Sequence, residues 1–121
     1  LVLFLIHFAF FLKVFKSRDN EKKLQEIYDF NFRQLELSIR EIGYGDQSIN
    51  KKMKDYINLF HAIVSDIHFW NNHDFVKKRE IVSKFLENFK NTEDLVVYFD
   101  KFMENLSKKT LNSYLKSVIN P

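Results

Sequence analysis

The chain has no cysteine, and glycine and proline are nearly absent: its 121 residues include two glycines, Gly43 and Gly45, and one proline, Pro121. Without cysteine there is no disulfide framework, no Cys-ligated zinc or iron–sulfur site and no Cys nucleophile. Sheet folds need glycine and proline at many turns, and residues 46–120 contain neither. The sequence therefore predicts an all-α fold.

Neither sign of charge dominates, because 19 Lys and Arg residues face 16 Asp and Glu, a formal net charge of +3. That excess is too small to indicate nucleic-acid binding by itself. Hydrophobic residues at 45% and charged residues at 29% are ordinary values for a globular protein and argue against a disordered chain. A chain of this length builds one core, so we expect a single helical domain over residues 1–121.

Breaks between helices are marked by Asn, Asp, Ser and Thr, which favour turns and N-caps. We predict a single helical bundle of about six helices without a sheet. The predicted helices cover residues 1–16, 21–42, 49–68, 74–90, 93–106 and 110–119.

The helix predicted at residues 21–42 has a charged face and an apolar face. Asp29–Arg33 and Glu36–Arg40 have the acid-first spacing that stabilises a helix by about 0.2–0.5 kcal/mol per pair. This pattern is typical of an amphipathic helix whose charged face is in solvent. The apolar face consists of Leu24, Ile27, Tyr28, Leu35, Ile39 and Ile42.

Apolar stripes with the same spacing run along the later helices, and 14 phenylalanines predict a strongly aromatic core. The expected core residues are Ile49, Met53, Tyr56, Phe60, Ile63 and Ile67 in the third helix, Phe75, Val82, Phe85, Leu86 and Phe89 in the fourth, Leu95, Phe99, Phe102 and Leu106 in the fifth, and Leu111, Tyr114, Leu115 and Val118 in the sixth.

The first twelve residues, LVLFLIHFAFFL, are the most apolar stretch. As a helix they span roughly 18 Å, which is short of the ~30 Å hydrocarbon layer of a membrane. Three interpretations stay open: a buried core helix, a helix that contacts a membrane or a partner, and the remnant of a membrane span. Lys13, Lys16 and Arg18 follow the stretch, whereas a signal peptide carries its positive charge first. Because the chain begins with Leu1, we interpret it as a fragment or processed form that lacks N-terminal sequence.

Residues that could carry catalysis or hold a metal are sparse. The four histidines, His7, His61, His68 and His73, include no pair at the i, i+4 spacing of a helical metal site. GxSxG, GxGxxG and P-loop motifs are absent. We therefore expect a protein that is not an enzyme, with no metal, no cofactor and no small-molecule substrate.

Both glycines lie in one short connection. Gly43 suits the position just after the end of the second helix, where a left-handed residue is common. Asp46 or Ser48 is positioned to cap the third helix.

Three lysines follow this connection, Lys51, Lys52 and Lys54, which we call the basic ledge. In the first turns of a helix their charges oppose the helix dipole. Two interpretations stay open. The basic ledge is a docking surface for an anionic partner such as RNA, acidic lipid or an acidic protein, or it is three solvated lysines partly offset by Asp46 and Asp55.

The stretch from Leu35 to Lys54, LELSIREIGYGDQSINKKMK, resembles the signature of the ubiquinol–cytochrome c chaperone family. That family includes the mitochondrial assembly factors for respiratory complex III and their alphaproteobacterial relatives. The shared pattern is Arg-Glu-(apolar)-Gly-x-Gly-Asp, a short apolar spacer, basic residues and Met-Lys, and the strong match covers about residues 24–60. The positions carried over as candidate partner-binding residues are Arg40, Glu41, Gly43, Gly45, Asp46, Lys51, Lys52, Met53 and Lys54.

The resemblance implies an all-helical, non-enzymatic assembly chaperone for complex III that binds newly made cytochrome b or another complex III component. Mitochondrial members act near the ribosome exit site and the inner membrane, with a small partner protein. The implied location is therefore cytoplasmic and peripheral to the inner membrane, or on the matrix side in an organelle. An apolar groove of the bundle would accept a membrane-protein segment while the basic ledge fixes its orientation.

The chain also departs from the family pattern. His61-Ala62-Ile63 stands where the family often has Tyr-Gly-Arg, and the family carries sequence before the first apolar helix. The alternative is a peripheral membrane or ribosome- or RNA-associated helical module, to which a second basic run, Lys77, Lys78 and Arg79, would contribute.

Overall fold

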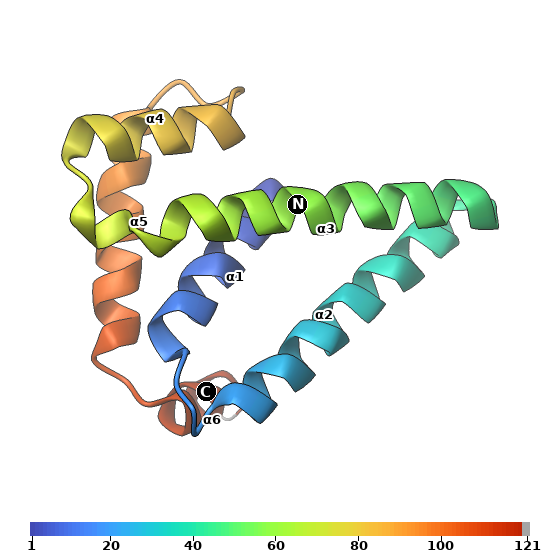
Figure 1. Ribbon diagram of the computed structural model, residues 1–121, viewed down its shortest axis with the longest axis horizontal. Helices are drawn as coiled ribbons and strands as arrows, with labels where there is room; N and C mark the ends of the chain where they lie inside the picture. The colour runs from blue at the N-terminus through green and yellow to red at the C-terminus, as the bar shows by residue number, and fades with distance from the viewer. Residues whose placement is uncertain (120–121) are drawn as a thin grey trace.

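A computed structural model describes residues 1–119, and within them every regular element is a helix and no strand occurs (Figure 1). The predicted all-α fold of six helices is therefore confirmed. The elements are α1 (Val2–Phe15), α2 (Glu21–Ile42), α3 (Asp46–His68), a short 3-10 turn η1 (Trp70–Asn72), α4 (Phe75–Phe85), α5 (Thr92–Ser107) and α6 (Leu111–Ile119).

The helices form a body and an arm. In the body, α1 packs against both α3 and α5, and α4 packs on α5. Helix α2 joins the same core through Leu24 and Phe32, whereas its end and the start of α3 extend away from the body: in Figure 1 the two helices run away from α5 and converge at the right of the view. We call this pair the α2–α3 arm.

The apolar start of the chain is the centre of the core. Phe10 is fully buried and lies between the ring of Phe99, stacked with centroids 5.3 Å apart, and Trp70, edge-on at 5.1 Å. Phe8 stacks on Phe60 of α3 at 5.3 Å. Of the three interpretations of the first twelve residues, the buried core helix is confirmed. None of the helices in the described part of the chain combines the length and hydrophobicity that a membrane span requires.

His7 is the one polar side chain within this apolar stretch, and both of its ring nitrogens are hydrogen-bonded. Nδ1 lies 2.6 Å from the carbonyl oxygen of Leu3, and Nε2 lies 2.6 Å from the hydroxyl of Tyr98 on α5. A carbonyl only accepts, so Nδ1 carries the proton, and in the neutral ring Nε2 accepts from the tyrosine. His7 therefore ties α1 to α5.

Several predicted helix ends are wrong. Helix α3 begins at Asp46, three residues earlier than predicted, so Ser48 lies inside the helix and Gly45 is the N-cap without a side-chain hydrogen bond. Helix α4 ends at Phe85 rather than at residue 90. There the chain turns, with the Phe89 amide donating to the Leu86 carbonyl.

Some predicted core positions are also wrong. Ile42, Phe75, Phe89 and Val118 are exposed, because the first three lie at or beyond helix ends and the last on the outer side of α6. Conversely, Phe32, Trp70, Ile81 and Val96 are buried without having been expected in the core. In α2 the Glu36–Arg40 pair forms, whereas Asp29 accepts a hydrogen bond from Gln25 rather than pairing with Arg33.

Candidate functional site

The elbow between α2 and α3 depends on one glycine. Gly43 has a φ of 103°, a left-handed conformation, and its amide donates to the Arg40 carbonyl, which ends α2 as predicted. Gly45 has an ordinary extended backbone with φ −74° and ψ 164°. A Cβ atom added at either glycine would meet open space. Only Gly43 therefore requires glycine, and it does so because of its backbone conformation.

Arg40 joins the two helices of the elbow. Its guanidinium donates to Glu36 within α2 at 3.2 Å and to Asp46 at the start of α3 at 3.0 Å. These hydrogen bonds to Glu36 and then to Asp46 raise the pKa of the Arg40 side chain above its ordinary value. The predicted cap role of Asp46 is wrong, because its carboxylate binds Arg40 rather than the free amides of α3.

The basic ledge lies on the surface just beyond this elbow. Lys51 and Lys54 are exposed, and among residues 1–119 neither takes part in an ion pair. Lys52 is half-buried, with its Nζ atom 4.5 Å from the centre of the Tyr44 ring. The carboxylate of Asp46 pairs with Arg40 rather than with any of these lysines.

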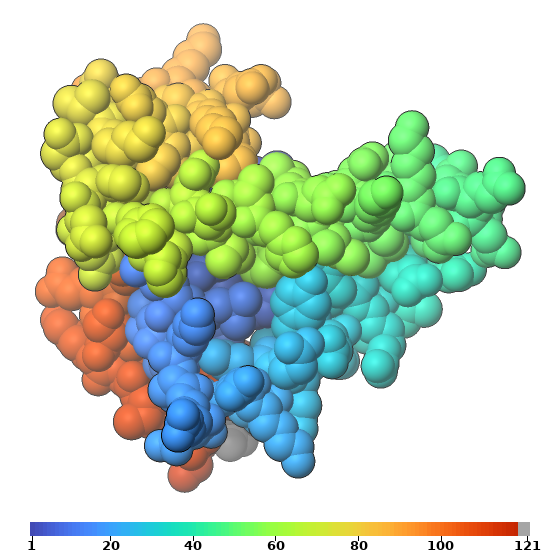
Figure 2. Space-filling model, viewed as in Figure 1, coloured from blue at the N-terminus to red at the C-terminus, as the bar shows by residue number. Residues whose placement is uncertain are grey.

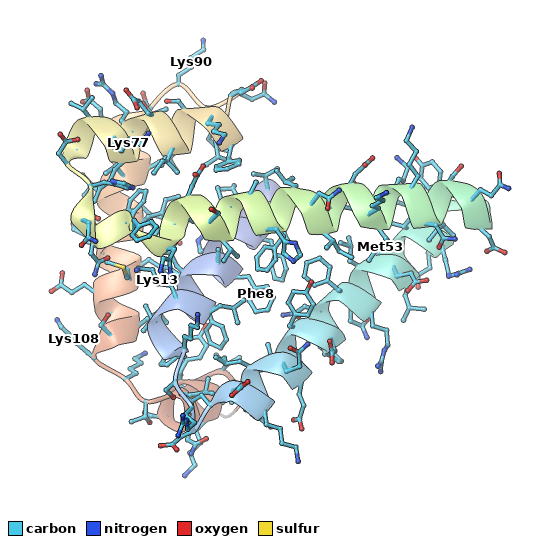
Figure 3. All side chains as sticks on the ribbon, viewed as in Figure 1. Phe8, Lys13, Met53, Lys77, Lys90 and Lys108 are labelled. Carbon is cyan, nitrogen blue, oxygen red and sulfur yellow. The ribbon has the colours of Figure 1, made fainter. Side chains whose placement is uncertain are left out.

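Met53 differs from its lysine neighbours because it points inward. It is half-buried and packs against the main core, and Figure 3 places it where α3 faces α2. Near the elbow, Ile39 and Ile49 are buried outside the main core cluster. The elbow is thus supported by Met53, Gly43 and the Arg40–Asp46 contact. The exposed residues that a partner can reach are Glu41, Lys51 and Lys54.

The second basic run is neutralised within the molecule. All three of its cations have a carboxylate partner, although two of the pairs are exposed and such pairs contribute little. The pairs are Lys77 with Glu80 at 3.7 Å, Lys78 with Asp100 at 3.0 Å and Arg79 with Glu93 at 3.0 Å.

The structure also contains a groove whose position the sequence did not predict. It has a volume of about 710 Å³ and lies between the second half of α1, the first turns of α2 and the last turns of α3. Along α3, its nearest lining residue, Val64, is ten positions from Lys54, which corresponds to roughly 15 Å of helix.

Metal-binding geometry is not found in residues 1–119, where no three His, Asp or Glu side chains come together to hold an ion. His61 and His68 are both exposed on α3, and their spacing of seven brings no carboxylate with it.

Comparison with known proteins gives no match: no protein-family model, no curated protein and no solved structure is similar to this chain. The resemblance of residues 24–60 to the ubiquinol–cytochrome c chaperone signature therefore stays a prediction.

Proposed function

We propose that this protein is a non-enzymatic assembly chaperone for respiratory complex III that binds newly made cytochrome b or another complex III component. One observation carries the proposal. The segment that resembles the family signature forms an arm outside the main body, and this arm presents Lys51 and Lys54 without an internal ion-pair partner in the described chain.

The arm offers apolar side chains as well as charge. Phe30 and Leu37 are about half exposed, and their spacing of seven puts them on one face of α2. Ile42 and Tyr44 are exposed at the elbow. A client that alternates membrane segments with short charged loops presents both kinds of surface, and electrostatic attraction to the basic ledge fixes its orientation.

The proposed place of action is the cytoplasmic side of the inner membrane, or the matrix side in an organelle, with a ribosome exit site or a small co-chaperone as neighbours. This part of the proposal rests on the family resemblance, which supplies the partners, and on the exposed lysines, which suit anionic surfaces such as ribosomal RNA.

The proposal is tested in cells of the source organism that lack the gene. We expect complex III to fall while other respiratory complexes keep their levels, and the wild-type gene to restore it. A gene carrying Lys51→Glu and Lys54→Glu should fail to restore complex III. The matched control carries Lys90→Glu and Lys101→Glu, two exposed lysines outside the arm with the same change in net charge, and should restore it. Normal complex III in the deletion strain would refute the client assignment.

The second candidate is a peripheral membrane module, favoured by the same unpaired lysines, because anionic lipid attracts such residues. Since α1 is buried in the core, this candidate rests on the basic ledge alone. Flotation of the protein with anionic vesicles in the absence of any client distinguishes the two candidates. A peripheral membrane module binds the vesicles without a client, whereas a client-specific chaperone does not float with them.

A further inference from the structure

The groove beside α1 has the size of a small-molecule site. Its volume of about 710 Å³ lies within the range of roughly 300–1,000 Å³ that is usual for ligand pockets. In Figure 2, α1 is recessed between α2 and α3 on the face shown. The stacked rings of Phe8, Phe60 and Tyr28 lie next to its inner end and keep α1, α2 and α3 at fixed positions.

The lining of the groove changes from charged to apolar with distance from the turn that joins α1 and α2. On α1 the lining passes from Lys16 to Leu12, and on α2 it passes from Glu21 to Tyr28. Val64 of α3 adds a further apolar side chain. The groove therefore has a charged mouth and an apolar inner end.

The mouth carries more positive than negative charge. Lys16 and Arg18 are exposed there, and no ion pair within residues 1–119 involves either of them. Lys13 donates to the carbonyl of His68 and so closes the side of the groove between α1 and α3. Glu21 is the carboxylate that lines the mouth.

We propose that this groove binds a single-chain anionic amphiphile, with its alkyl chain along Leu12, Tyr28 and Val64 and its head group between Lys16 and Arg18. Removal of the alkyl chain from water drives binding, and attraction to the two cations positions the anionic head group. A helix of a partner protein fits less well, because twelve residues line the groove and a standard protein interface uses about 20–30 on each side. The sequence had led us to expect no small-molecule substrate.

This inference does not rest on the proposed chaperone function, because it uses none of the residues of the basic ledge. Its test is titration calorimetry of the full chain with dodecyl phosphate below the concentration at which it forms micelles. We expect saturable binding of one molecule per chain. Dodecyl maltoside, which has the same chain and a neutral head, should bind at least about tenfold more weakly, and inorganic phosphate should give no measurable binding.

Variants locate the binding. Lys16→Glu combined with Arg18→Glu should weaken dodecyl phosphate binding at least about tenfold while far-UV circular dichroism stays unchanged, because both side chains are exposed. The charge-matched control, Lys90→Glu with Lys101→Glu, and the ledge variant, Lys51→Glu with Lys54→Glu, should bind as the wild type does.

Three results would overturn the proposal. The first is equal affinity for dodecyl phosphate and dodecyl maltoside. The second is an unchanged affinity for dodecyl phosphate in the Lys16→Glu, Arg18→Glu variant. The third is that the protein binds anionic phospholipid vesicles but not monomeric dodecyl phosphate. The last result would make the mouth of the groove a membrane contact instead.

Discussion

The α1-centred body and the α2–α3 arm differ in residue type and in burial, because α1 is almost entirely apolar whereas α2 has a charged face and an apolar face. In the body, α1 contributes seven buried residues and is enclosed by α3 and α5. In the arm, α2 is longer yet buries only Leu24, Phe32 and Ile39, and its polar side chains form a surface network around Arg40. The body therefore supplies stability, whereas the arm keeps apolar and charged groups available to a partner.

Substitution in the body should have the largest effect. Phe10→Ala removes a ring that is fully buried between Phe99 and Trp70, so we expect it to lower the free energy of unfolding by about 3–5 kcal/mol. Urea denaturation monitored by circular dichroism measures this. A loss below about 1 kcal/mol would contradict the assignment of α1 as the centre of the core.

Substitutions at the elbow should lower the free energy of unfolding by less than Phe10→Ala does, and they should affect the two glycine positions differently. Gly43→Ala forces a Cβ atom into a left-handed backbone, which should cost about 1–2 kcal/mol. The control, Gly45→Ala, should change stability by less than about 0.5 kcal/mol, because the N-cap preference for glycine and the lower chain entropy of alanine oppose each other. Equal losses from the two variants would show that the conformation of Gly43 does not define the elbow.

The clamp at Arg40 should contribute a smaller amount. Arg40→Gln removes both hydrogen-bonded ion pairs but leaves an exposed polar side chain, so the loss of stability should be smaller than that of Gly43→Ala and should shrink at high salt. Hydrogen exchange should show faster opening at the start of α3 than in α1. Uniform acceleration across α1 and α3 would mean that the arm and the body unfold as one unit.

The smallest effect concerns pH. Burial, and then the charge of Asp29, raise the pKa of Tyr28 above its ordinary value of 10.0, so the folded state favours the neutral phenol. This contribution is fully present below pH 10.0 and is lost as the pH rises through the folded-state pKa, because ionisation of the unfolded chain then favours unfolding. Tyr28→Phe should therefore reduce the alkaline loss of stability, measured by urea denaturation across this range. If Tyr28→Phe lost as much stability at alkaline pH as the wild type does, ionisation of Tyr28 would not be the cause of that loss.

Much of the body could be predicted from composition and periodicity. The near absence of glycine and proline favoured helices throughout, and the positions of Phe60, Ile63 and Phe99 in the core followed from helical spacing. Trp70 was missed because it lies in a short 3-10 turn, where no periodic pattern exists, and its burial depends on α1 and α5 closing over it.

The candidate site was predictable only in part. Gly43 was identified correctly, because a left-handed helix end has a recognisable glycine signal. Asp46 was misassigned as a cap because sequence spacing does not show that Arg40, six residues earlier, reaches its carboxylate across the elbow. The groove depends on Val64 and His68 of α3 lying beside α1 and α2, which are distant from them in sequence, so only the tertiary structure locates it.

The central claim, that the exposed lysines of the arm bind the client, is tested most directly by affinity purification at physiological salt from cells that express the tagged full chain. The account predicts that cytochrome b or another complex III component is recovered with the wild type and with the Lys90→Glu, Lys101→Glu control, and is strongly reduced with Lys51→Glu, Lys54→Glu. Equal recovery with all three proteins would contradict it.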